Sequence, residues 1–322
     1  MTTTTTTTAT PAIAATGLRK AFGDHVVLDG IDLTVPEGTV FALLGPNGAG
    51  KTTIVHILST LIGADAGAVR IAGHDLASDP DGVRSAIGVT GQFSAVDNLL
   101  TGTENLVLMS DLRQLGKRAG RRLAAELLER FDLVDAAGKP VSTYSGGMKR
   151  RLDLAMTLVG DPRIIFLDEP TTGLDPRSRR TMWQIVRDLV ADGVTILLTT
   201  QYLDEADELA DRIAVLDGGR IVADDTPEEL KRLVPGGHVL LRFADPRGLE
   251  SASHALNGQG HTASGLTLKV PSDGSLRGLK RLLDRLDDES IEVEELTVHT
   301  PDLDDVFFAL TGPNENERVE TR

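Results

Sequence analysis

A glycine-rich stretch at residues 45–52, GPNGAGKT, limits the fold of this chain more than any other feature. The apolar run TVFALL leads into it, and TTIVHILSTLI follows Lys51 with apolar residues at helical spacing. Two glycines separated by four residues and followed by Lys and Thr form a phosphate-binding loop when a strand precedes them and a helix follows. We therefore predict a strand, a loop and a helix here. The backbone amides and the helix N-terminus would face phosphate oxygens.

Two carboxylates end a second apolar run, RIIFLDEP. Successive side chains of a strand point in opposite directions, so Asp168 and Glu169 can serve different purposes. We predict that one of these carboxylates holds Mg²⁺ while the other faces an attacking water, that the hydroxyl of Thr52 can also ligate the ion, and that Lys51 reaches the outer phosphates. A flexible glycine turn and a solvated strand end are the plainer interpretations of the two motifs. Their occurrence in one chain favours a nucleotide site.

A second glycine pair begins an amphipathic helical pattern in YSGGMKRRLDLAMTL. Ser145 fits a helix N-cap, which needs no glycine after it. Gly146 and Gly147 additionally let the backbone approach a ligand closely, and the helix dipole favours an anion there. The motif therefore predicts a second anion-binding element.

Composition limits the classes of partner. The 322 residues suggest two domains, and 40% apolar with 25% charged residues is typical of a globular protein. A net charge of −15 disfavours nucleic acid and anionic lipid surfaces. The absence of cysteine excludes disulfides and thiolate sites and fits the cytoplasm. No apolar run is long enough to span a bilayer, so we expect a membrane role only through a partner.

Residues 1–15 are threonine-rich and predict a disordered tail. Residues 16–233 alternate apolar runs with helical patterns, which indicates an α/β domain with a largely parallel sheet. A helical subdomain is expected at about residues 94–160, where Thr101 and Glu104 fit a capping box. A turn near residues 234–237 leads to a small α+β domain over residues 238–311, and residues 312–322 are predicted to be a flexible tail.

Two further features have plain interpretations. The seven histidines are scattered without metal-ligand spacing, so we expect surface or core histidines. The acidic run at residues 204–211 predicts one solvated helix face with Leu203, Ala206, Leu209 and Ile213 turned inward.

In this order and spacing the motifs resemble the nucleotide-binding subunit of ABC transporters over residues 16–230. Residues 45–52 match its Walker A loop, SGGM its signature, IIFLDE its Walker B strand and TTGLDP its D-loop. Gln92 in VTGQF matches the Q-loop, and Phe22 in KAFGD matches the aromatic residue that stacks on adenine. The family usually has a histidine where this chain has Gln201, and leucine and glutamine where it has Tyr144 and Met148. An amide can donate to phosphate but cannot carry a proton charge, so this departure bears on the rate of hydrolysis and on its dependence on pH.

The resemblance implies a P-loop NTPase fold and the cofactors ATP and Mg²⁺. It also implies a second ATPase subunit, most simply a homodimer, and an integral membrane permease that holds the protein at the inner face of the membrane. Catalytic roles fall to Glu169, Gln201, Gln92 and Lys51, and metal ligation to Thr52, Gln92 and Asp168. The implied nucleotide contacts are Phe22, Gly45, Pro46, Asn47, Gly48, Ala49, Gly50, Lys51, Thr52, Thr53, Ser145, Gly146, Gly147 and Asp175.

The chain most resembles the daunorubicin-resistance group of drug-export ATPases, and this resemblance implies efflux of a hydrophobic drug or antibiotic. The features that carry it are Gln201, TTGLDP, YSGGM and the terminal PDLDDVFFAL. Other functions stay open. These are a soluble ABC-type ATPase that acts on another macromolecule, a non-hydrolysing nucleotide switch, and the ATPase of a lipid or polysaccharide exporter.

Overall fold

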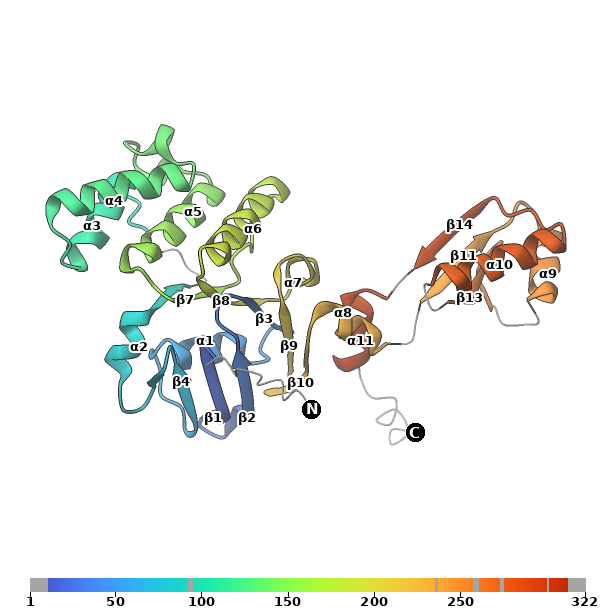
Figure 1. Cartoon of the computed structure of the whole chain (residues 1–322), viewed down its shortest axis with the longest axis horizontal. Coiled ribbons are helices and arrows are strands. Elements are labelled where there is room, and N and C mark those ends of the chain that lie inside the picture. Colours follow the sequence, from blue (N-terminus) through green and yellow to red (C-terminus); the bar gives the residue numbers. More distant parts are fainter. Residues whose placement is uncertain are drawn as a thin grey trace, which may run out of the picture. The chain divides into compact units, whose positions relative to one another are not determined.

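The computed structural model describes residues 11–91, 95–234, 237–256, 261–272, 275–299 and 301–311. The chain divides into two compact units, one that ends at Pro227 and one that begins at Glu228 (Figure 1). The sequence predicts a first domain that continues to residue 233. The boundary therefore lies earlier than predicted, within helix α8 (Pro227–Arg232).

An antiparallel sheet forms the first layer of unit 1, with strand order β2-β1-β4-β5. Its strands are β1 (Ile13–Phe22), β2 (His25–Val35), β4 (Ala66–Ile71) and β5 (His74–Asp75). Ala12 and Ile13 are buried, so the predicted tail over residues 1–15 extends too far: the ordered chain begins before residue 16. The sequence did not predict this separate antiparallel layer, because β1 pairs with β2 through register shifts that interrupt a simple alternation.

The second sheet has the order β10-β9-β3-β8-β7-β6. Its strands are β3 (Val40–Leu44), β6 (Ile87–Thr90), β7 (Ile164–Asp168), β8 (Thr195–Thr200), β9 (Arg212–Asp217) and β10 (Arg220–Asp225). All but β10 run parallel, as predicted. Leu44 pairs with Thr200, and Asp168 with Thr199, so β3, β7 and β8 end at one edge of the sheet. Ligands of open parallel sheets bind at such carboxyl edges.

Helix α1 (Lys51–Leu58) lies between the two sheets (Figure 1). Its residues Ile54, Val55, Ile57 and Leu58 share one buried core with apolar side chains of both sheets. The other helices around the parallel sheet are α2 (Pro80–Ala86), α6 (Pro176–Ala191) and α7 (Leu203–Leu209). This packing fixes the N-terminus of α1 at the carboxyl edge.

A helical cluster interrupts unit 1 between β6 and β7. It consists of α3 (Gly102–Leu112), α4 (Lys117–Arg130) and α5 (Gly146–Thr157), with short 3₁₀ helices at Val134–Ala136, Val141–Thr143 and Leu158–Gly160. The predicted capping box is present, because the Glu104 amide donates to Thr101 Oγ1 (3.2 Å) and the Thr101 amide to Glu104 Oε2 (2.8 Å). Helix α4 turns Leu127 and Leu128 into the core.

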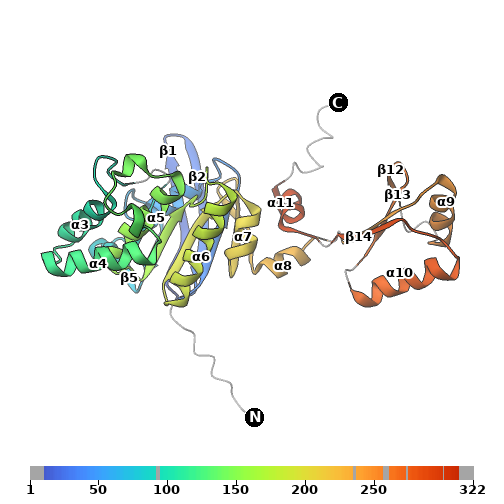
Figure 2. The same cartoon turned by 90° about the horizontal axis from the view of Figure 1, so that it is seen from above.

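Unit 2 contains a four-stranded antiparallel sheet of order β12-β13-β11-β14 (Figure 2). Its strands are β11 (His238–Arg242), β12 (His261–Ser264), β13 (Thr267–Pro271) and β14 (Glu295–His299). Its further helices are α9 (Pro246–Ala255), α10 (Leu276–Asp288) and α11 (Leu303–Thr311). Strand residues such as Val239 and Leu268 share a core with Ala252 of α9 and Leu286 of α10. These elements have the α+β composition predicted for the residues after the turn at 234–237.

Candidate active site

The loop between β3 and α1 needs glycine at two positions where the chain packs tightly. A Cβ on Gly45 would collide with the carbonyl oxygen of Leu216. Gly50 has φ +107°, and a Cβ there would lie 2.7 Å from Leu28 Cδ2. Left-handed backbone and the lack of space both exclude larger residues. Strands β2 and β9 therefore hold the predicted phosphate loop in shape from two sides.

Lys51 is the first residue of α1 and is almost completely buried. Its Nζ donates to the carbonyl oxygens of Gly45 (2.7 Å) and Pro46 (3.1 Å). Burial lowers the pKa of the Lys51 ammonium, while the negative charges of Glu169 and Asp168 act in the opposite direction. The loop thus holds a cation beside the free amides of a helix N-terminus, an arrangement suited to phosphate.

Asp168 ends β7 with a buried carboxylate. Thr199 Oγ1 donates to its Oδ1 (2.5 Å), and Thr52 Oγ1 lies 3.1 Å from Oδ2 and 3.3 Å from Oδ1. The parallel register places Thr199 opposite Asp168, and the phosphate loop supplies Thr52. The structure therefore brings the predicted metal ligands Thr52 and Asp168 together.

Glu169 has a strained backbone, with φ +47° in the left-handed region. Its amide donates both to the carbonyl oxygen and to Oγ1 of Thr199, at 3.1 Å each. Its Oε2 accepts from Thr172 Oγ1 (3.1 Å). These bonds offset a backbone cost of about 1–3 kcal/mol and direct this carboxylate away from the buried position of Asp168.

The residues predicted to form a second anion-binding element begin α5, and Asp175 stands at the start of α6. Ser145 caps α5, where its Oγ accepts from the Met148 amide (3.3 Å). Asp175 caps α6 by accepting from the Arg177 and Ser178 amides (3.0 Å each) and from Ser178 Oγ (2.6 Å). These hydrogen bonds lower the pKa of Asp175, and the bond from the Ser178 hydroxyl has the largest effect. Within the described part of the chain, no hydrogen bond or ion pair joins Ser145 or Asp175 to the phosphate loop.

The two signature glycines meet different surroundings, which leads to a prediction about stability. A Cβ on Gly147 would lie 2.6 Å from Ser178 Oγ and 2.9 Å from Ser178 Cβ, whereas the nearest atom to a Cβ on Gly146 is Leu174 Cδ2 at 3.9 Å. Overpacking costs about 1–3 kcal/mol. We expect Gly147→Ala to lower the free energy of unfolding by that amount in urea melts. Gly146→Ala should not lower it, and equal losses in the two variants would contradict this packing.

Comparison with known proteins identifies the family. A family model described as ABC transporter matches residues 28–172. The chain is 48% identical to the daunorubicin resistance ATP-binding protein DrrA2 of Streptomyces coeruleorubidus, over 97% of this chain and 98% of that protein. The chain belongs to the ABC transporter ATP-binding proteins.

Other relatives of this ABC ATPase match with similar coverage. The daunorubicin/doxorubicin resistance ATP-binding protein DrrA of Streptomyces peucetius is 46% identical over 96% of this chain and 95% of its own length. The Nod factor export ATP-binding protein I of Burkholderia orbicola is 39% identical over 92% and 95%. A solved structure described as an ATP binding subunit of an ABC transporter matches 69% of this chain and 92% of its own, at 27% identity and a TM-score of 0.62. The predicted ABC ATPase fold, ATP binding and ATPase activity are confirmed.

Of the remaining predicted residues of this ABC ATPase, the structure describes Gln201 and Phe22 but not Gln92. Gln201 directly follows β8 and is half-buried. Phe22 ends β1 with 52% of its surface exposed, and Lys20 Nζ lies 5.4 Å from its ring centroid. Gln92 lies outside the described residues, so its predicted part in metal ligation stays a prediction. Among the described residues, no helix has both the length and the apolar character needed to cross a bilayer.

Two polar residues near the site were not predicted. Thr199 holds both Asp168 and Glu169, as described above. Glu205 belongs to the acidic run expected on a solvated helix face, but it is fully buried and accepts from Trp183 Nε1 (3.2 Å). Ile213, expected on the inner face of the same helix, is buried in strand β9 instead. The only sequence signals were the paired threonines before Gln201 and an acidic residue next to the inward-facing Ala206. The positions of Thr199 and Glu205 depend on contacts between strands and between helices that are far apart in the sequence.

Glu205 makes the stability of this ABC ATPase depend on pH. Burial raises the pKa of its carboxyl, and hydrogen bonding to Thr200, Thr171 and Trp183 opposes this only in part. A folded-state pKa above the unfolded value means that its contribution is complete below the unfolded pKa and is lost as pH rises towards the folded pKa. We therefore expect the stability of Glu205→Gln relative to wild type to increase with pH in that window, by at most about 1.4 kcal/mol per pH unit. Urea melts across pH would measure it, and a difference independent of pH would contradict it.

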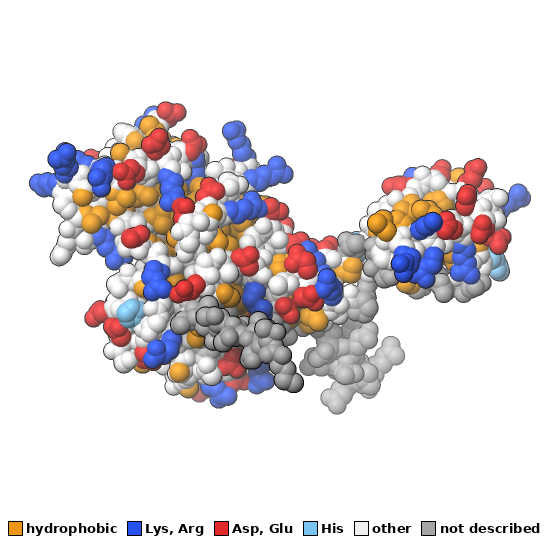
Figure 3. Space-filling view, viewed as in Figure 1, with side chains coloured by type: hydrophobic (Ala, Val, Ile, Leu, Met, Phe, Trp, Pro, Cys, Tyr) orange, Lys and Arg blue, Asp and Glu red, His pale blue; other side chains and the backbone are white. Residues whose placement is uncertain are grey.

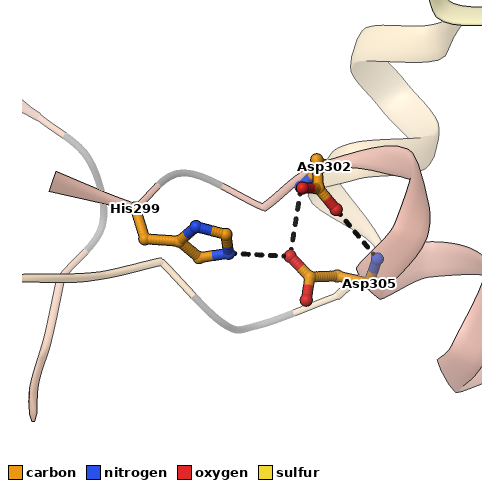
Figure 4. A group of neighbouring side chains, drawn as sticks. All are labelled: His299, Asp302 and Asp305. Atoms are coloured by element: carbon orange, nitrogen blue, oxygen red, sulfur yellow. Dashed lines mark hydrogen bonds and ion pairs between the residues drawn. The ribbon is translucent and has the colours of Figure 1, made fainter. Parts of the chain in front are cut away.

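One cluster outside the nucleotide site has the composition of a metal site. Ligand atoms of His299, Asp302 and Asp305 lie within 4.8 Å of one another (Figure 4). The Asp305 amide donates to Asp302 Oδ1 (3.0 Å), the Asp302 amide to Asp305 Oδ2 (3.2 Å), and His299 Nε2 lies 3.1 Å from the same Oδ2. This reciprocal pattern is a capping box at the start of α11, which explains the cluster without a metal.

Proposed function

We propose that this ABC ATPase powers efflux of a hydrophobic drug or antibiotic through a separate membrane permease. The observation that carries the proposal is similarity to a daunorubicin resistance protein over 97% of the chain, which extends through unit 2 as well as the ATPase unit. Figure 3 shows hydrophobic side chains gathered over the helical cluster, where Leu108 is 44% and Leu112 is 68% exposed. Exposed apolar surface of this kind supports a protein contact there. Through its permease the protein would lie at the inner face of the cell membrane.

ATP would enter at the phosphate loop. The Lys51 ammonium would exchange the carbonyls of Gly45 and Pro46 for the outer phosphate oxygens, which are stronger, charged acceptors. The backbone N–H groups of residues 47–53 would surround the phosphates, and Phe22 is free at its exposed face to stack on adenine. Binding would then need little rearrangement of the loop, because β2 and β9 already hold its glycines in place.

The donor set at Asp168 fits Mg²⁺. A buried carboxylate surrounded by the hydroxyls of Thr52 and Thr199 offers only oxygen ligands, which Mg²⁺ prefers. We assign Thr52 and Asp168, with Gln92 as predicted, to hold the ion beside the phosphates. When bound, it would neutralise charge that develops on the phosphate oxygens.

Glu169 would orient the attacking water and accept its proton. Thr199 fixes the backbone and Thr172 fixes Oε2, so one carboxylate oxygen is held while the other is available to water. A lone chain would leave this water open to solvent. Closure by Ser145 and Gly147 of a second copy would exclude solvent and add the α5 N-terminus to the terminal phosphate.

Pairing of two subunits is supported by a relative of known structure. The dimeric, post-hydrolysis ATP-binding cassette bound to ADP and phosphate matches 66% of this chain and 98% of its own, at 27% identity and a TM-score of 0.60. In a head-to-tail pair each nucleotide would contact the phosphate loop of one chain and the Ser145 region of the other. Asp175 would lie near the partner, although its side chain already caps α6 in its own chain.

Gln201 would contact the terminal phosphate from the end of β8. An amide can donate a hydrogen bond there, and loss of that bond to a charged group costs about 1.5–3 kcal/mol. We expect Gln201→Ala to lower ATP turnover roughly tenfold or more and Gln201→His to keep or raise it. Steady-state phosphate release measures both. Unchanged turnover in Gln201→Ala would mean that this side chain is only exposed polar surface.

Export can be tested in a drug-sensitive host that expresses the chain together with a candidate membrane permease. Daunorubicin accumulation should fall, and Glu169→Gln expressed at the same level should restore it. The Nod factor relative, at 39% identity, makes export of another molecule the competing hypothesis. Unchanged drug accumulation with active ATP hydrolysis would refute drug export and leave the ATPase assignment intact.

A further inference from the structure

A buried arginine on α5 links three segments of unit 1. Arg150 is only 8% exposed, and its guanidinium donates to three backbone carbonyls: Nε to Pro170 (3.0 Å), Nη1 to Gly91 (2.6 Å) and Nη2 to Asp168 (2.9 Å). Burying a cation costs several kcal/mol of folding free energy unless hydrogen bonds and charges compensate for the lost water. An apolar side chain could fill the same space without this cost, so the hydrogen bonds of Arg150 are the reason for an arginine here. The planar fork of arginine fixes the three carbonyls relative to one another.

Asp153 lies one turn further along α5 and completes this arrangement. Its Oδ1 accepts from the Ala95 amide (3.1 Å), and its Oδ2 lies 3.6 Å from Arg150 Nη1. Arg150 and Asp153 therefore hold Gly91 and Ala95, which flank residues 92–94 on either side. The same helix face also binds the segment around Glu169 through Asp168 and Pro170.

Helix α5 begins with the signature Ser145–Gly147, less than two turns before Arg150. In the proposed dimer the signature contacts the nucleotide of the partner, whereas Asp168 and Glu169 serve the nucleotide of their own chain. A helix moves as a rigid body over this length. Any shift of α5 towards the partner's nucleotide would therefore pull on the carbonyls that set Asp168 and Glu169.

We propose that Arg150, supported by Asp153, is a positioning residue that makes hydrolysis at the two nucleotide sites of the dimer interdependent. The inference rests on the proposed head-to-tail pairing. Arg150 touches neither nucleotide in this arrangement, and acts by joining the signature of one site to the catalytic carboxylates of the other.

Arg151 provides a matched control on the same helix. Its Nη1 also donates to backbone carbonyls, those of Phe131 (2.8 Å) and Asp132 (3.1 Å), and pairs with Asp132 Oδ2 (3.0 Å). These partners all belong to the helical cluster and none to the catalytic strand. Arg151→Lys therefore also replaces a guanidinium that donates to backbone carbonyls, but it leaves the hydrogen bond between Arg150 and Asp168 unchanged.

The test compares phosphate release by the full-length wild type, Arg150→Lys and Arg151→Lys over a range of ATP concentrations. A lysine ammonium keeps the charge but cannot span three carbonyls. For Arg150→Lys we expect turnover about tenfold lower, a Hill coefficient reduced towards 1, and a Kd for ADP that stays within about twofold of wild type, since the phosphate loop is untouched. Arg151→Lys should keep the wild-type turnover and Hill coefficient.

Equal turnover and Hill coefficients in the two variants would overturn the inference. If Arg150→Lys does not fold, Asp153→Asn replaces it: the amide oxygen still accepts from Ala95, but the charge beside Arg150 is lost, so the Hill coefficient should again fall. A wild-type Hill coefficient in Asp153→Asn would then overturn the inference. A wild-type chain that neither hydrolyses ATP nor dimerises with it would refute the proposed function itself. Hydrolysis and dimerisation without the Arg150 effect would refute this inference alone.

Discussion

Glu169→Gln is expected to lower steady-state ATP hydrolysis by about 100-fold or more, because proton transfer by a positioned base contributes about 10²–10⁴ to such rates. Glutamine has the same shape as glutamate and can occupy the same left-handed backbone position, so the change removes the proton acceptor with little effect on strain. Thr172 can still hold the side-chain oxygen. Lys51 and the phosphate loop are unchanged, and ATP should bind with near wild-type affinity.

The same variant should accumulate as an ATP-bound dimer. In the wild type, hydrolysis of the ATP bound between the two chains lets the dimer open. When hydrolysis is blocked, the binding free energy of intact ATP would keep the two chains closed. Size-exclusion chromatography with light scattering, with and without Mg-ATP, measures this directly. Glu129→Gln on the exposed face of α4 is the control that removes one charge elsewhere. Wild-type turnover in Glu169→Gln would remove Glu169 from the proposed role, and a monomer with bound ATP would contradict head-to-tail closure.

The local parts of the site were predictable because their chemistry lies in contiguous residues. Residues 45–52 carry the glycines, the lysine and the hydroxyl of the phosphate loop in one stretch, and the flanking strand and helix patterns identify its context. Asp168 and Glu169 end a short apolar run whose length and composition are typical of a buried strand. Helix caps at Thr101, Ser145 and Asp175 follow from one turn of sequence.

The contacts that position the site could not be predicted because they join residues far apart in sequence. Thr199 meets Asp168 only through the register of two parallel strands, which the composition of either strand leaves undetermined. Arg150 stands among other basic residues in KRRL, and nothing local distinguishes the buried arginine from its neighbour. Glu205 is similar: an acidic run indicates solvent, but Trp183 on another helix buries one of its members. Sequence thus predicts which groups do the chemistry better than which groups hold them.

Lys51→Ala is expected to weaken ATP binding by about 10- to 100-fold and to reduce turnover at least as much. The ammonium would make charge-assisted hydrogen bonds to phosphate, and such bonds contribute about 1.5–3 kcal/mol each. In the structure Lys51 donates to the carbonyl oxygens of Gly45 and Pro46, and alanine would leave both acceptors without this donor. The free energy of unfolding should therefore also fall, by about 1–3 kcal/mol for buried groups that lose a partner.

These two effects of Lys51→Ala can be separated by measuring ATP binding and urea unfolding on the same preparation. Lys117→Ala, at the exposed start of α4, removes the same charge far from the loop in sequence and should leave both quantities unchanged. Added nucleotide stabilises only a protein that binds it, so saturating ATP should shift the wild-type and Lys117→Ala melts upward and shift Lys51→Ala much less. An equal ATP-induced shift in all three proteins would mean that the cation at the start of α1 does not hold the phosphates. The nucleotide site would then have to be sought elsewhere on the carboxyl edge of the sheet.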